Sequence, residues 1–146
     1  MRPALPPSAA AAVAAVAAAV LALTVAGCGG IKAPDLFLVT RTGAGASADL
    51  TLLVNEEGGV HCNGKPAGKL SDPRIVQARA ITEKLEKPSS EHLRLAPQPN
   101  SVLHYDVRDA NGTVSFADNS LDQPKVLREL VLLVLQSAQQ VCHLPE

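Results

Sequence analysis

Two His–Cys pairs are the first candidates for chemistry in this sequence of 146 residues. His61-Cys62 and Cys142-His143 stand in mirrored order, about 80 residues apart. Two cysteines and two histidines can hold zinc, but zinc ligands in a motif are usually two to four residues apart, and adjacent side chains on a strand or helix point apart. We therefore expect a Cys62–Cys142 disulfide and no metal or other cofactor. Free thiols and a zinc site are the alternatives.

A second candidate is a set of polar side chains in "VLHYDVRDANGTVSFAD", residues 102–118. Asn111-Gly112 suits a two-residue type I′ turn, which would close a hairpin with Val107 opposite Phe116. Tyr105 and Val114 would then point inward too. The polar side chains that alternate with them would point to the other face, together with a residue from an earlier strand. The expected binding face is Arg41, His104, Asp106, Arg108 and Ser115. A solvated strand face without function is the alternative.

No motif in the sequence predicts catalysis. Gly43-x-Gly45-x-x-Ala48 is similar to a dinucleotide fingerprint, but the fingerprint needs a helix directly after it, and Asp49–Asn55 has the pattern of a strand. Asp109-x-Asn111-Gly112 lacks the spacing of a calcium loop. A G-x-S-x-G motif is absent, and none of the four histidines has an acid or a nucleophile at an interpretable spacing. We therefore expect a protein that is not an enzyme.

The N-terminal segment has the pattern of an export signal. Arg2 is the only charged residue before Lys32, and residues 9 to 25 are almost entirely Ala, Val and Leu. Val25-Ala26-Gly27-Cys28 resembles the bacterial lipobox, in which a diacylglyceryl group is attached to the cysteine and the chain is cut before it. The resemblance implies lipidation of Cys28. A plain cleaved signal and a retained helix are the alternatives.

This resemblance implies a simple organisation of the chain. Residues 1–27 would be a lipoprotein signal peptide, 28–34 a lipidated tether, and 35–146 one domain. Seven residues reach at most about 25 Å, so the domain would lie close to the bilayer. The expected location is the extracytoplasmic face of the cell membrane, with the bilayer as a partner through acylated Cys28.

Composition limits the classes of partner. Without Arg2 the chain has 12 basic against 14 acidic side chains, and this balance argues against nucleic acid. With no Trp, one Tyr and two Phe, the core must be mainly aliphatic, and platforms for stacking bases or sugars are nearly absent.

The periodicity predicts an α+β domain. We expect three strands, then a loop at Gly64–Leu70, a helix that Asp72-Pro73 begins and Pro88 ends, the hairpin, and a last helix from Pro124 to Cys142. Leu130–Leu135 is apolar on all sides and should be buried on more than one side. The order βββ-α-ββ-α predicts a single antiparallel sheet of about five strands with two helices packed on one face.

Two resemblances bear on function. The alanine-rich signal, the lipobox and the size resemble the small uncharacterised lipoproteins of high-GC Gram-positive bacteria. More weakly, "LFLVTRTG", "LTLLV" and "GGVHCNG" are similar to the opening of the subtilisin-inhibitor-like proteins, although only one disulfide can form here instead of two. We expect a membrane-anchored, non-catalytic binding or structural module with a partner protein in the envelope. A protease inhibitor, with Gly64–Leu70 or Ala96–Ser101 as its loop, is the alternative; an envelope enzyme is a further one.

Overall fold

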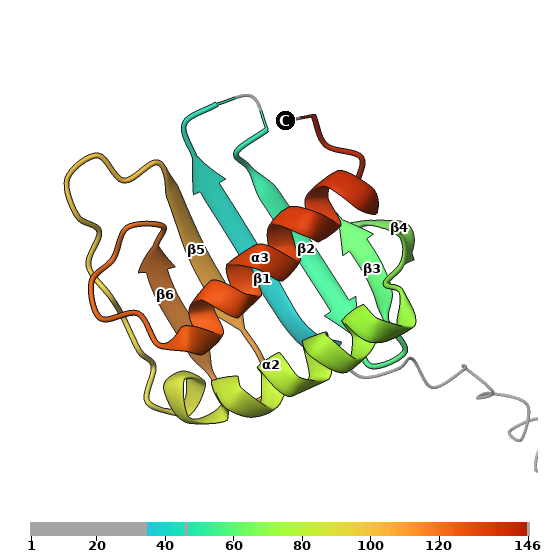
Figure 1. Ribbon diagram of the computed structural model, residues 1–146, viewed down its shortest axis with the longest axis horizontal. Coiled ribbons are helices and arrows are strands. Elements are labelled where there is room, and N and C mark those ends of the chain that lie inside the picture. The colour runs from blue at the N-terminus through green and yellow to red at the C-terminus, as the bar shows by residue number, and fades with distance from the viewer. Residues whose placement is uncertain (1–34, 46, 146) are drawn as a thin grey trace, which may run out of the picture. The chain divides into compact units, whose positions relative to one another are not determined.

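The computed structural model describes residues 35–45 and 47–145, which form one sheet and two helices. Cys28 and the segments 1–27 and 28–34, with their predicted roles, lie outside the described residues. The elements follow in the order β1 (Asp35–Gly43), β2 (Leu50–Asn55), β3 (Gly59–Cys62), β4 (Lys65–Lys69), α2 (Asp72–Ser90), β5 (Leu103–Arg108), β6 (Thr113–Ala117) and α3 (Lys125–Gln140) (Figure 1).

The sheet is antiparallel throughout, with strand order β4-β3-β2-β1-β5-β6. The α+β class and the two helices are as predicted, but the sheet has six strands and not five. The additional strand is β4, in the segment expected to be a loop. Asn63 and Gly64 both have positive φ, 51° and 78°, and join Cys62 to its partner Lys65. This is the conformation of a type I′ hairpin turn.

Strand β4 has the properties of an edge strand. All five of its residues are exposed, and a bulge interrupts its pairing with β3 between Val60 and His61. Pro66 and Gly68 disfavour a central strand, whereas proline, lysine and a bulge at an edge discourage pairing with another chain. The same residues explain why the pattern resembles a loop.

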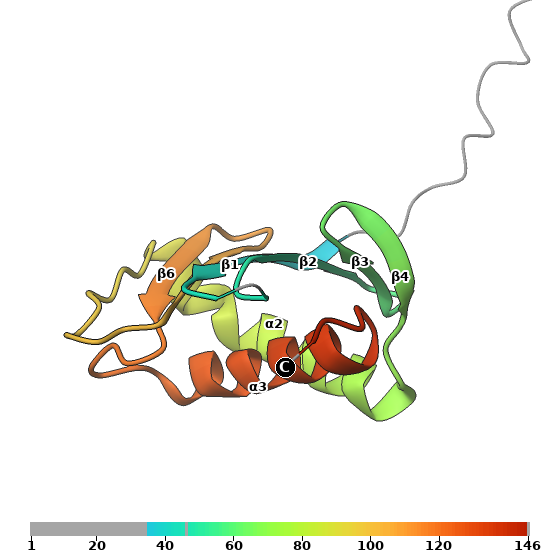
Figure 2. The same cartoon turned by 90° about the horizontal axis from the view of Figure 1, so that it is seen from above.

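Both helices lie on one side of the sheet (Figure 2). The core between them is mainly aliphatic, with Tyr105 and Phe116 stacked at 5.2 Å between ring centroids. Most of the helix residues in this core are fully buried: Ala78, Ile81 and Leu85 from α2, and Leu127, Leu130, Leu133 and Val134 from α3. Residues Ala33–Glu146 form one compact unit, and this unit contains the hydrophobic core.

The helix ends differ from the expectation. The N-cap of α2 is Ser71 and not Asp72, and Asp72 lies in the first turn. Pro88 does not end α2, which continues to Ser90. Proline costs less there than in a helix interior because it removes one hydrogen bond from a turn that is about to end. No helix within the described residues is long and apolar enough to cross a membrane.

Helix α3 is not buried on several sides. Leu132 and Leu135 are 51% and 38% exposed, while Leu130 and Leu133 are buried. The helix covers the sheet with one face and leaves these two leucines partly exposed to solvent.

The predicted disulfide is confirmed. Cys62 at the end of β3 is bonded to Cys142, two residues after α3, with 5.8 Å between their Cα atoms. The two sulfurs are therefore neither free thiols nor zinc ligands. The compact unit Ala33–Glu146 contains both the hydrophobic core and the disulfide, which are the features that a domain needs to fold alone.

The hairpin of β5 and β6 has the predicted faces but not the predicted register. Val107 pairs with Val114, and Tyr105 pairs with Phe116. The connection is a four-residue loop in which the Asp109 carboxylate accepts hydrogen bonds from the backbone N–H groups of Asn111 and Gly112. The shift of two residues leaves every side chain on its expected face because strands repeat every two residues.

Candidate functional site

The open face, the sheet face on the side away from α2 and α3, carries most of the predicted binding residues. His104 and Asp106 of β5 have side chains 40% and 60% exposed. Arg108 is exposed, and Ser115 of β6 is half-buried directly opposite Asp106. Their neighbours Tyr105, Val107 and Val114 are about 1% exposed on the helix side. The alternation along β5 and β6 therefore positions four of the five predicted residues together.

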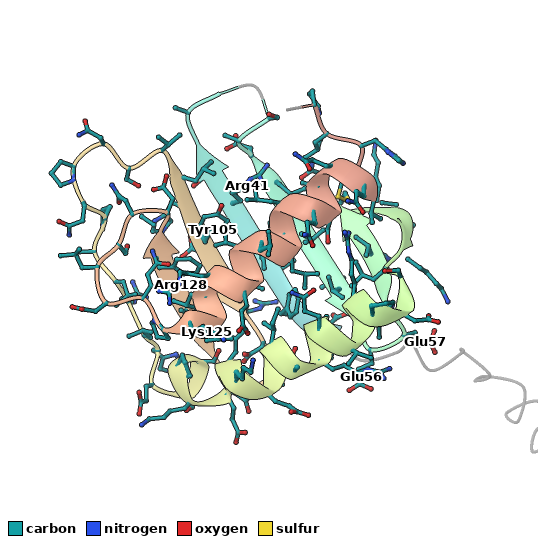
Figure 3. All side chains as sticks on the ribbon, viewed as in Figure 1. Arg41, Glu56, Glu57, Tyr105, Lys125 and Arg128 are labelled. Atoms are coloured by element: carbon teal, nitrogen blue, oxygen red, sulfur yellow. A yellow bond between two sulfur atoms is a disulfide. The ribbon has the colours of Figure 1, made fainter. Side chains whose placement is uncertain are left out.

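Arg41 is not on the open face, contrary to the prediction. It is 5% exposed and lies in the same phase of β1 as Phe37 and Val39, which are buried. Its Cα partner in β5 is Tyr105, which belongs to the core side (Figure 3). The side chain stays in this position by donating from Nε to the Ala48 carbonyl at 2.8 Å and from Nη2 to the Ser47 carbonyl at 2.6 Å.

Three of the open-face residues form one hydrogen-bonded cluster. Ser115 Oγ donates to Asp106 Oδ1 at 2.7 Å, and His104 Nε2 lies 3.1 Å from Ser115 Oγ. The hydroxyl hydrogen is engaged by the carboxylate, so Nε2 of His104 must carry a proton and donate to Ser115 Oγ. His104 Nε2 is also 3.6 Å from Asp106 Oδ2.

This cluster contains the residue types of a Ser-His-Asp triad in a different arrangement. In a triad the carboxylate binds Nδ1 of the histidine, and Nε2 accepts the serine proton. Here both Asp106 and Ser115 face Nε2, and the serine proton is directed to the carboxylate. The arrangement fixes three polar groups in place and directs the serine hydroxyl to the carboxylate instead of to the imidazole.

The sequence pattern missed Arg94. Leu93 and Leu95 bind the backbone of Ser115 at 2.9 Å each, and Arg94 forms an isolated parallel bridge with Ser115. Leu93 and Leu95 pack against the core while Arg94 is exposed. The alternation Leu-Arg-Leu is the sequence signal that could have identified this extended segment.

The docking hollow is a shallow depression of about 280 Å³ in the open face. The residues that line it include Asp106 and Ser115 of the cluster, the exposed Arg94 and Arg108, and Leu38 and Thr40 of β1. Beside it, Leu38 pairs with Leu53 of β2, and both are half-buried. The open face thus combines a small apolar centre with a polar border that carries charges of both signs.

The segments considered as protease-binding loops are both ordered by other interactions. Gly64–Leu70 contains β4. In Ala96–Ser101, Ser101 N donates to Gln98 O, and Asn100 has φ 66°, so Gln98–Ser101 is a β-turn with Pro99 and Asn100 at its centre. Asn119 braces this turn: its Nδ2 donates to the carbonyls of Gln98 and Pro99, and its Oδ1 accepts from Gln98 N.

A further hollow of about 520 Å³ lies beside α2 and the β2–β3 turn. Its lining includes Glu56, Glu83 and Glu86, and Arg79 donates from Nη2 to the Glu56 carbonyl at 2.6 Å. Within residues 35–45 and 47–145, no group of three or more His, Cys, Asp or Glu side chains is arranged to hold a metal ion.

Comparison with known proteins adds no relative: neither the protein-family models, nor the curated proteins, nor the solved structures contain a match.

Proposed function

We propose that the protein is an exported lipoprotein, anchored through Cys28 at the outer side of the cell membrane, and that its domain is a non-catalytic binding module. The open face would be its docking surface for a partner protein of the envelope. The observation that carries this proposal is the asymmetry of the sheet: α2 and α3 cover one face, and the other presents a hydrogen-bonded polar cluster beside an apolar centre (Figure 2).

The composition of the open face supports a protein partner. Protein interfaces combine a small apolar core with a polar rim, and arginine is enriched in them. Leu38 and Leu53 would supply the core, and Arg94, Arg108 and Asp106 would supply charges that could pair with opposite charges of a partner. Asp106, already bonded to Ser115, would fix the register of the contact.

The geometry of Ser115 favours binding over catalysis. In serine nucleophiles the proton is usually taken by an imidazole, whereas the Ser115 hydroxyl points to the carboxylate of Asp106, which is a weaker base than an imidazole. The cluster is also open to water on a sheet face, where electrostatic stabilisation of a transition state is weak.

Site-specific crosslinking in cells tests this function. A photoreactive amino acid at Arg108 should give one discrete adduct, and the adduct should disappear when Asp106 is changed to Asn. The matched control places the same amino acid at Arg128 on α3, which lies on the other side of the sheet, and it should not give this adduct. Equal capture from both positions would contradict the docking surface. Turnover of an envelope substrate that is lost in His104→Ala would contradict a non-catalytic role.

Protease inhibition is the second candidate function, and the braced turn at Ala96–Ser101 is the observation that favours it. A protease cleft takes an extended segment, however, and Gln98–Ser101 is closed on itself by a hydrogen bond. Titration of the domain against subtilisin-like proteases separates the two functions, because stoichiometric inhibition that Asn119→Ala weakens would establish inhibition.

A further inference from the structure

A further cleft lies on the helix side of the sheet, at the end where the β1–β2 loop meets the C-terminal half of α3. We call it the Arg41 cleft. Its volume is about 260 Å³, and it shares no lining residue with the docking hollow. Its walls come from the β1–β2 loop with Ser47 and Ala48, from Leu103 of β5, from Leu135 and Gln139 of α3, and from Leu144.

Arg41 brings a positive charge to this cleft without a carboxylate to neutralise it. No ion pair within the described part of the chain involves Arg41, and none of the residues that line the cleft is acidic. Its two hydrogen bonds to the Ser47 and Ala48 carbonyls use two of the five guanidinium N–H groups. Those bonds satisfy donors but leave the charge uncompensated, and a buried charge of this kind is costly.

Tyr105, which pairs with Arg41 across β1 and β5, does not supply a negative charge. Burial raises the pKa of Tyr105, and this effect exceeds the opposing effect of Arg41, so the phenol remains neutral at ordinary pH. Asp118 is the carboxylate on this side, but it is bonded to Ser101 and to the backbone of Val102 and is not paired with Arg41. The free side of the Arg41 guanidinium can therefore take an anion from solution.

The remaining walls define the kind of anion. Leu103, Leu135 and Leu144 are aliphatic, and the volume corresponds to about nine water molecules. A guanidinium binds a carboxylate through two parallel hydrogen bonds. One arginine matches the single charge of a carboxylate, whereas a phosphate dianion would bring an excess charge into an apolar cleft.

We propose that the Arg41 cleft binds a small aliphatic carboxylate, with its carboxylate on the free side of the Arg41 guanidinium and its alkyl chain against Leu103, Leu135 and Leu144. This site is independent of the open face and of the proposed docking function. The competing explanation is that Arg41 only holds the carbonyls of the β1–β2 loop in place.

Titration of the unit Ala33–Glu146 with sodium octanoate, followed by amide chemical shifts, tests the proposal. We expect saturable shifts at Ala44, Gly45, Leu103 and Gln139, and none at Thr113 or Ser115. 1-Octanol, which has the same chain without the charge, should bind at least about tenfold more weakly. Equal affinity for octanol and octanoate, or no saturable shifts in the cleft, would overturn the proposal.

Variants separate the charge from the loop contacts. Arg41→Gln should lower octanoate affinity at least about tenfold, Arg41→Lys should lower it less, and the exposed Arg128→Gln should leave it unchanged. Unchanged octanoate affinity in Arg41→Gln would refute the proposal. If the Arg41 variants do not fold, the comparison of octanoate with octanol on the wild-type chain still tests the proposal. Glu146 follows Pro145 in the sequence, so a tenfold gain of affinity in Glu146→Gln would also refute it, by showing that the chain supplies its own anion.

Discussion

Removal of the Cys62–Cys142 disulfide should destabilise the domain strongly. The bond closes a loop with a sequence separation of 80 residues. In the chain-entropy model, a loop of this size lowers the entropy of the unfolded chain by about 15 cal/mol/K, which corresponds to about 4.5 kcal/mol at 25 °C. For a domain of roughly 110 residues the unfolding entropy is about 0.23 kcal/mol/K, so the melting temperature should fall by about 20 °C.

The assay is thermal and urea unfolding of the unit Ala33–Glu146 as wild type and as Cys62→Ala/Cys142→Ala. Wild type treated with a reductant is the matched control and should agree with the double variant within about 1 kcal/mol, because both cysteines are partly exposed and the loss of side-chain packing is small. A loss below about 1 kcal/mol would refute the entropic reasoning. Thiols that react with an alkylating reagent before reduction would refute the disulfide itself.

Three further predictions concern other parts of the chain. Mass spectrometry of the exported protein should find a diacylglyceryl group on an N-terminal Cys28; an unmodified Cys28 within an intact N-terminal segment would contradict this. Gly112→Ala should cost about 2–4 kcal/mol because its Cβ would collide with the carbonyl oxygen of Ser89, whereas Gly64→Ala, with open space around it, should cost only about 1 kcal/mol; similar losses would contradict the steric reason. Burial opposes ionisation of Asp118, but hydrogen bonds from Ser101 Oγ and from the backbone N–H groups of Val102, Leu103 and Asn119 lower its pKa overall. Its contribution to stability should therefore be present above about pH 4 and be lost as the pH falls further, and an Asp118→Asn variant that loses as much stability in acid as wild type would contradict this.

The sequence predicted the elements whose two faces differ in polarity. In β5 the inward residues Tyr105 and Val107 alternate with His104, Asp106 and Arg108, so the face of each residue followed from the pattern. The register did not follow, because Asn111-Gly112 also fits a longer loop. The carboxylate of Asp109 stabilises that loop, and it is held in turn by Ser89 Oγ of α2 at 2.7 Å. That contact is tertiary and leaves no signal in the hairpin sequence.

Strand β4 was missed although it had a local signal. Asn63-Gly64 has the residues of a type I′ turn, but Pro66 and Gly68 indicate a loop when the position of the strand in the sheet is unknown. Only an edge strand tolerates both residues, and the pattern of one strand does not show whether it lies at an edge. The same limit applies to Arg94, whose segment is extended because it binds β6.

Arg41 shows where alternation alone is insufficient. Both phases of β1 are apolar, with Leu36 and Leu38 in one and Phe37 and Val39 in the other, so the single arginine decided the predicted orientation. In the structure Phe37, Val39 and Arg41 of the central strand β1 are buried on the side of the helices, and Leu38 is only half-buried. Arg41 is tolerated at the end of the strand, where the Ser47 and Ala48 carbonyls are within reach. Thr40 and Arg41 are successive residues, and for that reason they line different sites, the docking hollow on one face and the Arg41 cleft on the other. The two depressions share no lining residue, so substitutions at Thr40 and Arg41 can test the two proposed sites separately.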